Sequence, residues 1–317
     1  YYKTRDLEKK ENFKLGGQIV REKNSISTSY RIKSRQLSNI YISHDKQLTK
    51  ENFKYFSPKL VKIFDNINNH KNSISLVYST FLDYGINSFT KLLDFYNYKL
   101  YNKDTYIKDE NIKYYAVFSG EQTLEEKIHI LKTINSEENK HGDIINILLI
   151  SKSGAEGLDL KNVRSVHIME PYWNYSLIEQ IIARAVRYKS HILLDKAEQN
   201  VQTYIYLSDY NKEFLKKEKD KIKESIKEQK NKKNKQESIE LTTDITLFKN
   251  AIKNQELIYK FLKTIASTSI ECTFFNHKKI NYECFNCISN NKELYKDNIE
   301  IDLNTSNNCQ ESKAIKA

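Results

Sequence analysis

Short apolar runs and amphipathic segments alternate along the middle of the chain. The runs of strand length are Ile74 to Tyr78, Tyr114 to Phe118, Ile144 to Ile150, Val163 to Ile168 and Val201 to Leu207. Segments with helical periodicity lie between them: one from Ser57 to Ile67, one across Phe89 to Phe95, one across Leu124 to Ile134 and one that starts at Ser176. Such alternation predicts an α/β fold, a parallel sheet with helices on both faces.

Two of the predicted helices carry informative signals. Ser57 followed by Pro58 is typical of a helix start, with serine as the N-cap and proline in the first turn. In the helix from Ser176, apolar residues recur at helical spacing and form one face, made of Leu177, Ile178, Ile181, Ile182 and Val186. Gln180, Arg184 and Arg187 then share one polar stripe, because they are spaced i, i+4 and i+7. Two guanidinium groups directed into one cleft indicate an anionic ligand.

Polar residues follow three of the predicted strands. The run that ends at Ile150 is followed by Ser151, Gly154 and Gly157, which allow a sharp turn and a close approach of the backbone to a ligand. Ser79 and Ser119 also stand at strand ends. Ligands of open parallel sheets bind beyond the carboxyl ends of the strands. We therefore expect a binding site at this edge of the sheet.

Composition divides the chain into four parts. Residues 1–54 are polar and weakly periodic, and are interpreted as a connector or the tail of a preceding domain with little independent folding. The parallel-sheet lobe is predicted over 55–210. A lysine-rich segment, 211–237, is interpreted as a solvated helix or a linker. Residues 238–317 are interpreted as a small helical C-terminal appendage with a helix around Leu247 to Ile265.

Charge and cysteine content limit the class of protein. The 52 Lys and Arg residues against 41 Asp and Glu residues give a net charge of +11. This favours a polyanionic partner, although lysines that only solvate helical surfaces are an equal alternative. No apolar stretch has the length of a membrane span and the N-terminus does not resemble a signal peptide, so no membrane association is expected. The four cysteines are expected as thiols or ligands in a reducing, cytoplasmic setting.

The order of the motifs resembles the second half of a known motor. Ser151-x-x-Gly154-x-x-Gly157-Leu158-Asp159-Leu160 resembles motif V, and Gln180-x-x-Ala183-Arg184-x-x-Arg187 resembles motif VI, of the superfamily 2 helicases and translocases. Pro171-Tyr172-Trp173-Asn174 is similar to a turn of the Snf2-like branch, Ser73 to Thr80 to motif IV, and Val117 to Gly120 with Glu125 and Glu126 to the turn that follows it. The most similar group contains the poxvirus early transcription factor small subunit and nucleoside triphosphatase I, with members in large DNA viruses and yeast linear plasmids.

The resemblance implies a fold and roles for individual residues. It implies a RecA-like C-terminal helicase lobe, in which Arg184 and Arg187 are catalytic and reach the phosphates of ATP across an interlobe cleft. Nucleotide-binding roles fall on Gly157, Asp159 and Gln180, and contacts to nucleic-acid phosphates on Tyr78, Ser79, Ser119, Gly120, Ser151 and Lys152. Two alternatives stay open: the arginines merely flank a surface helix, and Asp159 caps its own loop.

Half of the expected catalytic machinery is missing from the sequence. Neither a G-x-x-x-x-G-K-[ST] phosphate loop nor a D-E-x-[HD] strand end occurs. The chain also starts at Tyr1 without Met, so we expect a preceding RecA-like lobe of the same protein to hold most of the ATP and Mg²⁺. DNA or RNA is the expected substrate, an RNA polymerase or transcription-factor subunit a further partner, and the cytoplasm, a viral factory or a virion the location.

Two rival functions are compatible with the same residues. Ala183 stands where the family usually has Gly, which would suit a RecA-like module that binds nucleic acid or a polymerase without hydrolysing ATP. An unrelated Rossmann-type domain is disfavoured because no G-x-G-x-x-G follows a strand.

Single residues elsewhere suggest less specific roles. For Trp173, the only tryptophan, core packing is favoured over base stacking. Cys272, His277, Cys284 and Cys287 contain one C-x-x-C, and buried thiols are favoured over a zinc site because a strong second pair is missing.

Overall fold

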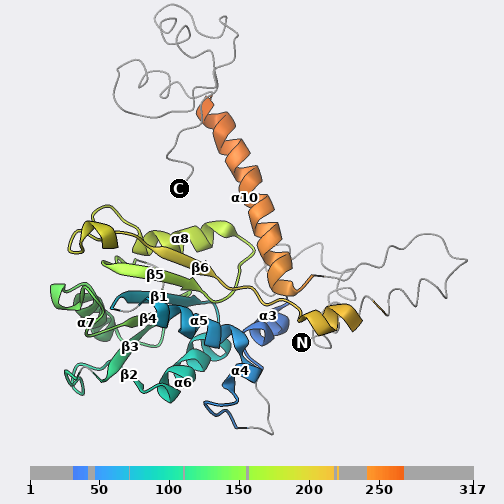
Figure 1. The fold of residues 1–317 in the computed structure, drawn as a ribbon. Helices are drawn as coiled ribbons and strands as arrows, with labels where there is room; N and C mark the ends of the chain where they lie inside the picture. The colour runs from blue at the N-terminus through green and yellow to red at the C-terminus, as the bar shows by residue number, and fades with distance from the viewer. Residues whose placement is uncertain are drawn as a thin grey trace, which may run out of the picture. The chain divides into compact units, whose positions relative to one another are not determined.

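The described part of the chain forms one parallel sheet covered by helices on both faces. The computed structural model describes residues 31–41, 47–70, 72–109, 111–154, 157–217, 220 and 241–267. The six strands are β1 (Ile74–Ser79), β2 (Tyr98–Leu100), β3 (Lys113–Phe118), β4 (Ile147–Ser151), β5 (Val163–Ile168) and β6 (Gln202–Ile205). Their order is β2-β3-β4-β1-β5-β6, and every pair is parallel (Figure 1). The α/β fold class predicted from the sequence is confirmed.

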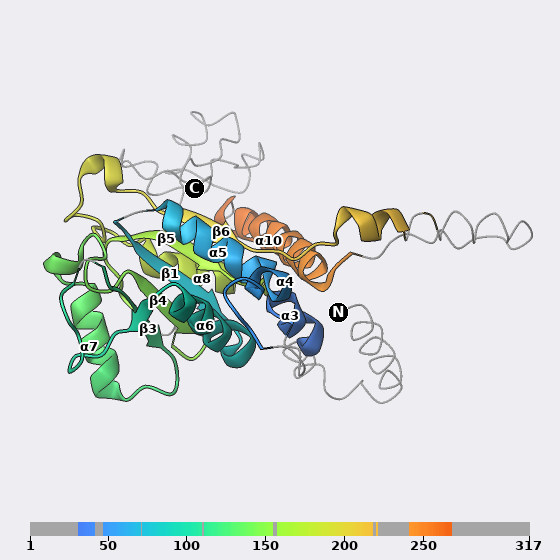
Figure 2. The same ribbon diagram turned by 60° about the horizontal axis from the view of Figure 1, so that its bottom comes forward.

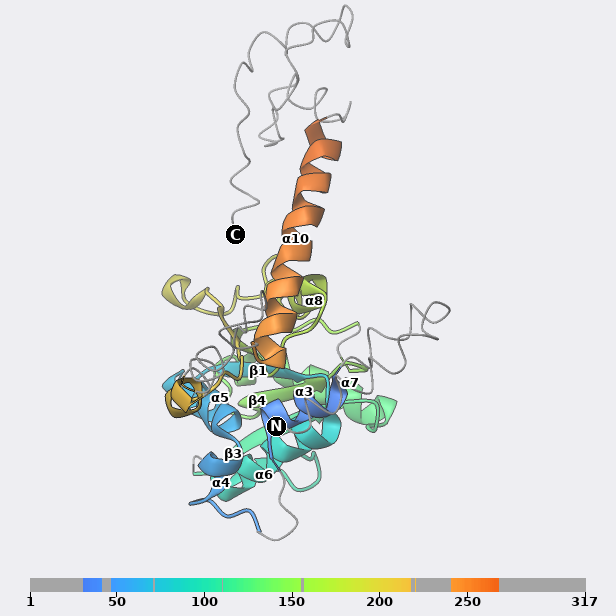
Figure 3. The same ribbon diagram turned by 90° about the vertical axis from the view of Figure 1, so that its right-hand side faces the viewer.

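Two hydrophobic clusters pack on opposite faces of this sheet. One contains residues of α7 (Leu124–Ile134) and α8 (Tyr175–Ala185) together with alternate strand residues such as Leu148 and Ile150. The other contains residues of α4 (Phe53–Phe56), α5 (Pro58–Asn69) and α6 (Asn87–Phe95) together with the intervening strand residues. In Figure 3, α8 and the pair α5 and α6 lie on opposite sides of the strands. The strands are buried on both faces, and this explains their continuous apolar runs.

The predicted helix starts agree with the observed ones. The Ser57 hydroxyl accepts a hydrogen bond from the backbone N–H of Leu60 at 3.1 Å, and Pro58 is the first residue of α5. Thr123 begins α7 with a reciprocal capping box, in which Thr123 and Glu126 satisfy each other's backbone N–H groups. Short helical turns complete this part of the fold: η2 (Leu82–Ile86), η3 (Glu137–Asn139) and η4 (Lys196–Glu198).

A helix that the sequence analysis did not predict precedes the sheet. It is α3 (Ile32–Asn39), which packs against α5 and against the η2 turn (Figure 2). Its buried residues are polar: Ser34, Arg35, Ser38 and Asn39. A helix whose buried face is polar lacks the apolar periodicity on which sequence-based prediction depends.

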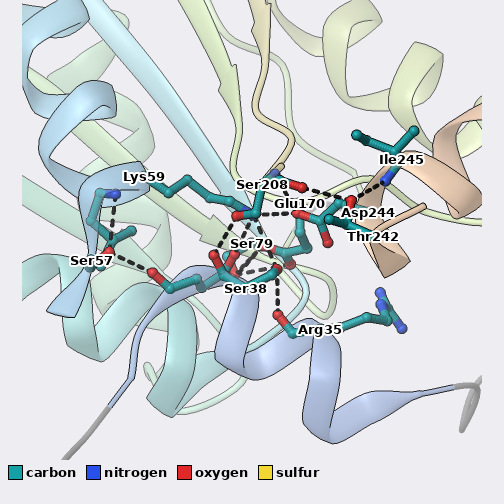
Figure 4. A network of polar contacts seen from close by, with 12 residues as sticks. Arg35, Ser38, Ser57, Lys59, Ser79, Glu170, Ser208, Thr242, Asp244 and Ile245 are labelled. Carbon is teal, nitrogen blue, oxygen red and sulfur yellow. Dashed lines mark hydrogen bonds and ion pairs between the residues drawn. The ribbon is translucent and has the colours of Figure 1, made fainter. Parts of the chain in front are cut away.

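A buried polar network joins α3 to parts of the chain far away in sequence (Figure 4). The ammonium group of Lys59 lies 2.7 Å from a carboxylate oxygen of Asp244, in the first turn of α10 (Thr243–Ser267). Lys59 also donates to Ser38 Oγ and to Asn39 Oδ1, both at 3.1 Å. The backbone N–H of Ser208, which follows β6, donates to the same Asp244 oxygen at 3.0 Å. The network therefore connects α3, α5, the end of β6 and the start of α10.

The chain divides into two compact units, Tyr1–Ala251 and Ile252–Ala317. Only the first turns of α10, up to Ala251, belong to the unit that contains the sheet. The helix predicted around Leu247 to Ile265 is confirmed as α10. The predicted lysine-rich segment lies mostly outside the described residues, and so do Cys272, His277, Cys284 and Cys287.

One buried histidine makes stability depend on pH. His167 in β5 is fully buried and contacts the Tyr206 hydroxyl through Nδ1 at 2.8 Å and Ser165 Oγ through Nε2 at 3.0 Å. Burial, with a smaller contribution from the charge of His70, lowers the pKa of His167 to about 3. The unfolded chain has the ordinary histidine pKa of about 6.5, so between these values the unfolded state binds the extra proton.

We therefore predict that the free energy of unfolding of the purified chain is fully retained above about pH 6.5 and falls as the pH is lowered toward 3. The contribution of His167 is about 1.4 kcal/mol per pH unit inside that window. Urea denaturation at a series of pH values measures this slope. His167→Gln should flatten it, whereas His141→Gln, in the turn before β4, serves as the control. An unchanged slope in His167→Gln would show that other groups cause the acid sensitivity.

Candidate functional site

The carboxyl ends of three neighbouring strands form the edge at which the predicted nucleic-acid-binding residues gather. Ser79 and Ser151 are the last residues of β1 and β4 and are paired in register. Phe118, the last residue of β3, is paired with Ile150, so Ser119 follows beside Ser151. The three serines therefore lie at one edge of the sheet, as the sequence predicted.

The loop after β4 is shaped by two glycines. A Cβ atom at Gly154 would lie 2.0 Å from the backbone oxygen of Phe118, so no residue with a side chain fits there without moving β3. Gly157 has φ +73°, a conformation that glycine adopts without strain. The next residue, Leu158, is buried in the core, and Asp159 is exposed. The loop thus leads from the carboxyl end of β4 toward the amino end of β5, with the Asp159 carboxylate exposed along it.

The two candidate arginines converge on this loop. Arg184 Nη1 lies 3.5 Å from the Leu158 carbonyl oxygen, and Arg187 Nη2 donates to the same oxygen at 3.0 Å. Arg187 Nη1 forms an ion pair with Asp159 Oδ1 at 3.1 Å. Motif-V-like and motif-VI-like residues, predicted from separate stretches of the sequence, are thereby brought together.

The prediction that Gln180, Arg184 and Arg187 share one helical stripe is wrong for Arg187. Helix α8 ends at Ala185, and Val186 is its C-cap. Arg187 therefore belongs to the loop after the helix, and it reaches the Leu158 carbonyl because that loop turns back. Gln180 is exposed on α8. Ala183, at the position where the similar family usually has Gly, is also exposed.

Two side chains that sequence reasoning missed hold this arrangement. Asn135, at the end of α7, donates from Nδ2 to the Asp159 carbonyl at 2.8 Å and accepts from the backbone N–H of Lys161 at 2.8 Å. Ser190 is buried and accepts from the backbone N–H of Arg187 at 3.2 Å. Its own backbone N–H donates to the Arg187 carbonyl at 3.0 Å. A single Asn or Ser in a loop carries no local signal of such a role.

The ion pair at the centre of the site is open to solvent. The Arg187 side chain is 39% exposed and that of Asp159 is 62% exposed. Exposed pairs of this kind contribute about 0–1 kcal/mol, so a phosphate group can displace Asp159 from Arg187 at small cost. The pair orients the guanidinium without binding it tightly. Asp159 thus makes the contact expected of an arginine-orienting carboxylate.

The predicted nucleic-acid contacts differ in accessibility. Lys152 and Gly120 are exposed, whereas Ser79, Ser119, Ser151 and Tyr78 are buried. Ser119 Oγ donates to Gln122 Oε1 at 2.8 Å, and Ser151 Oγ lies 3.0 Å from Ser153 Oγ. The serines shape the loops behind the exposed Lys152 and Gly120.

Tyr78 and Ser79 are both buried inside the protein. Burial raises the pKa of the Tyr78 hydroxyl, which therefore remains protonated. Ser79 Oγ lies 3.1 Å from both carboxylate oxygens of Glu170, a buried residue that follows β5. Glu170 also accepts from Asn39 Nδ2 at 2.9 Å and from the backbone N–H of Thr80. Ser79 and Glu170 therefore connect the end of β1 to the segment after β5 inside the protein.

The expected core role of Trp173 is wrong. Its side chain is 39% exposed, with its ring centre 5.7 Å from that of Tyr172. The adjacent Asn174 caps α8, because its Oδ1 accepts from the backbone N–H of Ser176 at 3.0 Å. The turn between β5 and α8 places the indole at the surface, beside the strand ends.

The arginines beside the Leu158–Asp159 loop supply positively charged hydrogen-bond donors. Within the described ranges, no group of three or more His, Cys, Asp or Glu residues is arranged to hold a metal ion. In the same ranges, no helix is both long and apolar enough to cross a membrane. The guanidinium groups of Arg184 and Arg187 suit the phosphates of a nucleotide.

Comparison with known proteins gives one family match and several viral and plasmid relatives. Residues 58–189 match the model of the helicase conserved C-terminal domain. A protein of Acanthamoeba polyphaga mimivirus named as a candidate ATP-dependent RNA helicase, R563, is 34% identical over 226 residues, which are 65% of this chain and 39% of that protein. The termination factor NPH-I homolog of African swine fever virus (isolate Pig/Kenya/KEN-50/1950) is 29% identical over 327 aligned positions, covering 89% of this chain and 44% of that protein.

An uncharacterised helicase of the killer plasmid pGKL-2 of Kluyveromyces lactis is 31% identical, over 62% of this chain and 30% of that protein. The chain thus spans less than half the length of these curated relatives.

Proposed function

Because residues 58–189 match the model of the helicase conserved C-terminal domain, we propose that the chain is the C-terminal motor lobe of a nucleic-acid-dependent ATPase of helicase superfamily 2. The observation that carries this proposal is the convergence of Arg184 and Arg187, at and just after the end of α8, on the Leu158–Asp159 loop that links β4 to β5. A motor lobe of this kind acts together with a preceding RecA-like lobe of the same protein.

The arginines would act on the phosphates of ATP. The nucleotide and its Mg²⁺ would be held mainly by the preceding lobe, because the sequence contains neither a phosphate loop nor a D-E-x-[HD] strand end. Mg²⁺ supplies charge neutralisation at the transferring phosphoryl group. On closure of the two lobes, Arg187 would exchange Asp159 for a phosphate oxygen and stabilise the charge that develops in the transition state. Arg184 would hold the Leu158 loop in place.

Nucleic acid would bind at the exposed loops that follow the carboxyl ends of β3 and β4. Lys152 and Gly120 are exposed there. A lysine ammonium group and a backbone N–H group can each bind a phosphate without contacting a base. The excess of Lys and Arg over Asp and Glu favours such a polyanion. Sequence-independent contacts suit a protein that moves along a strand. The similarity to viral and plasmid helicases supports a role in the replication or transcription of a DNA element, with an RNA polymerase or transcription-factor subunit as a partner.

Steady-state ATP hydrolysis by the full-length parent protein tests the proposal. The rate is measured with Mg²⁺ alone and after addition of single-stranded and duplex DNA and RNA. We expect stimulation by at least one of these nucleic acids. Nucleic-acid binding without any stimulated hydrolysis would instead support the rival function, a module that keeps the fold and only binds. Absence of both activities would refute the motor and the binding module together.

A further inference from the structure

One buried cation at the carboxyl edge of the sheet has guanidinium nitrogens with no hydrogen-bond acceptor among the described residues. Arg35 in α3 is 3% exposed, and its Nε and Nη2 atoms are buried without a hydrogen-bond partner. Within the described residues it forms no ion pair. A guanidinium group does not lose its proton in a protein, so the positive charge of Arg35 persists where it lies. A buried charge without hydrogen-bond partners is costly unless a ligand completes its coordination.

The guanidinium is held in place by aromatic rings from the strand ends. Its central carbon lies 5.1 Å from the centre of the Phe81 ring and 5.6 Å from the centre of the Tyr172 ring. Phe81 follows β1 and Tyr172 follows β5. These contacts stabilise a cation but satisfy none of its N–H groups. They fix the orientation of Arg35 and leave two of its nitrogens without a hydrogen-bond acceptor.

Glu170, the acidic residue near Arg35, already accepts hydrogen bonds from other groups. The oxygens of Glu170 accept from Ser79, Asn39 and Thr80. In Figure 4 the guanidinium of Arg35 points away from the oxygen atoms around Glu170 and Ser79. The position of Arg35 is therefore not explained by a carboxylate of the described chain.

A second cation shares the same aromatic ring. The ammonium group of Lys152, in the loop after β4, lies 5.7 Å from the centre of the Tyr172 ring, and Lys152 is exposed. Two positive groups from α3 and from the β4 loop thus approach one ring at the edge where nucleic acid is proposed to bind. A phosphodiester is a ligand that matches two cations held beside one aromatic ring.

We propose that Arg35 and Lys152, arranged around Tyr172, form a phosphate-binding site for the backbone of a nucleic-acid strand. This inference rests on the proposed function and adds to it a contact from α3, a helix that precedes the family-matched residues. Arg35 donates to a phosphate oxygen when its guanidinium shifts outward by a side-chain rotation, and Lys152 neutralises the same or the next phosphate. The site reads no bases and therefore gives affinity rather than sequence preference.

The test uses the full-length parent protein and fluorescein-labelled single-stranded and duplex DNA and RNA of fixed length. Fluorescence anisotropy gives the dissociation constant at a series of NaCl concentrations. Arg35→Met removes the charge and keeps an apolar stem. We expect it to weaken binding about 10- to 100-fold, the effect of losing a charged hydrogen bond. The slope of log affinity against log salt should fall by about 0.7 for a single strand or 0.9 for a duplex.

A structural role for Arg35 would give a different result. If the residue serves a ligand, Arg35→Met in the absence of nucleic acid should melt at the parent temperature or above, because an unpartnered buried charge has been removed. A lower melting temperature with unchanged affinity and salt slope would overturn the proposal and indicate a partner elsewhere in the protein. Arg164→Met is the matched control, since Arg164 lies at the opposite end of β5 and pairs with Glu198. It should bind as the parent does.

Lys152→Gln, at an exposed loop position, decides the outcome if Arg35→Met does not fold. The proposal requires a reduced salt slope in this variant, and a slope equal to that of the parent overturns the paired site. If the parent protein hydrolyses ATP on nucleic acid and both variants bind nucleic acid as the parent does, the proposed function stands and the Arg35–Lys152 site is refuted. A parent that binds no nucleic acid would refute the proposed function itself.

Discussion

Replacing Arg187 with alanine is expected to lower the nucleic-acid-stimulated rate of ATP hydrolysis by the full-length protein about 10³- to 10⁵-fold, the contribution of an arginine finger in related phosphoryl-transfer sites. The reason is geometric as well as electrostatic. Arg187 directs one nitrogen to Asp159 and another to the Leu158 carbonyl, so its planar donors are fixed before a phosphate arrives. A preorganised donor at the developing charge is the largest single contribution available to such a site.

The measurement is kcat with saturating nucleic acid, together with ATP binding by a fluorescent analogue. ATP binding should change little, because most of the nucleotide is proposed to be held by the preceding lobe. Arg187→Lys keeps the positive charge but lacks the planar set of N–H donors, so its kcat should remain far below that of the parent. Arg164→Ala, which removes a guanidinium that binds Asn200 and Glu198 instead of the Leu158–Asp159 loop, should retain the parent rate. A parent-like kcat in Arg187→Ala would exclude a transition-state role and favour the simpler interpretation of a surface arginine.

Replacing Lys59 with methionine is expected to lower the free energy of unfolding by about 3–5 kcal/mol, the usual cost of leaving one member of a buried ion pair alone. The side chain of Lys59 is 5% exposed and that of Asp244 is completely buried. After the substitution, the Asp244 carboxylate would keep only the Ser208 backbone N–H as a described donor. Its other oxygen has no partner even in the parent chain.

Urea denaturation of the purified chain measures this change, and a double-mutant cycle separates the pair from its surroundings. Lys59→Met combined with Asp244→Asn should recover part of the loss, because neither charge then remains buried alone. Lys62→Met, an exposed position on the same helix, should change stability by less than about 0.5 kcal/mol. Equal losses in the Lys59 and Lys62 variants would show that the ion pair does not stabilise the fold.

Local patterns were sufficient to predict the sheet and most of its helices. The runs that became β1, β3, β4 and β5 are buried on both faces, so their apolar residues are continuous and the signal is strong. The helix over Leu124–Ile134 was predicted at its observed bounds, because its capping residues and its apolar period agree. The strand-end serines and the glycine loop followed from the same order of elements.

The contacts that complete the site could not be predicted in this way. Asn39 and Glu170 are separated by 131 positions, and Lys59 and Asp244 by 185. Contacts between residues so far apart produce no periodic pattern in the sequence. The buried face of α3 is polar, so its sequence resembles that of a solvent-exposed segment. The end of α8 was also missed, because no glycine or proline marks the position after Ala185. Arg187 was therefore placed on a helix when it lies in the following loop.

The buried network around Lys59 has a consequence for how this lobe can be inherited or transplanted. Residues 58–189 contain every candidate catalytic and nucleotide-binding residue, yet Lys59 and Glu170 inside that range depend on Asn39, Ser208 and Asp244 outside it. If residues 58–189 alone were transferred into another protein, Lys59 would lose Asp244 and Glu170 would lose Asn39. Such a graft is expected to misfold although each motif is intact. The segment that folds as a unit is therefore longer than residues 58–189, and we expect substitutions at Asn39, Ser208 and Asp244 to be coupled to those at Lys59 and Glu170.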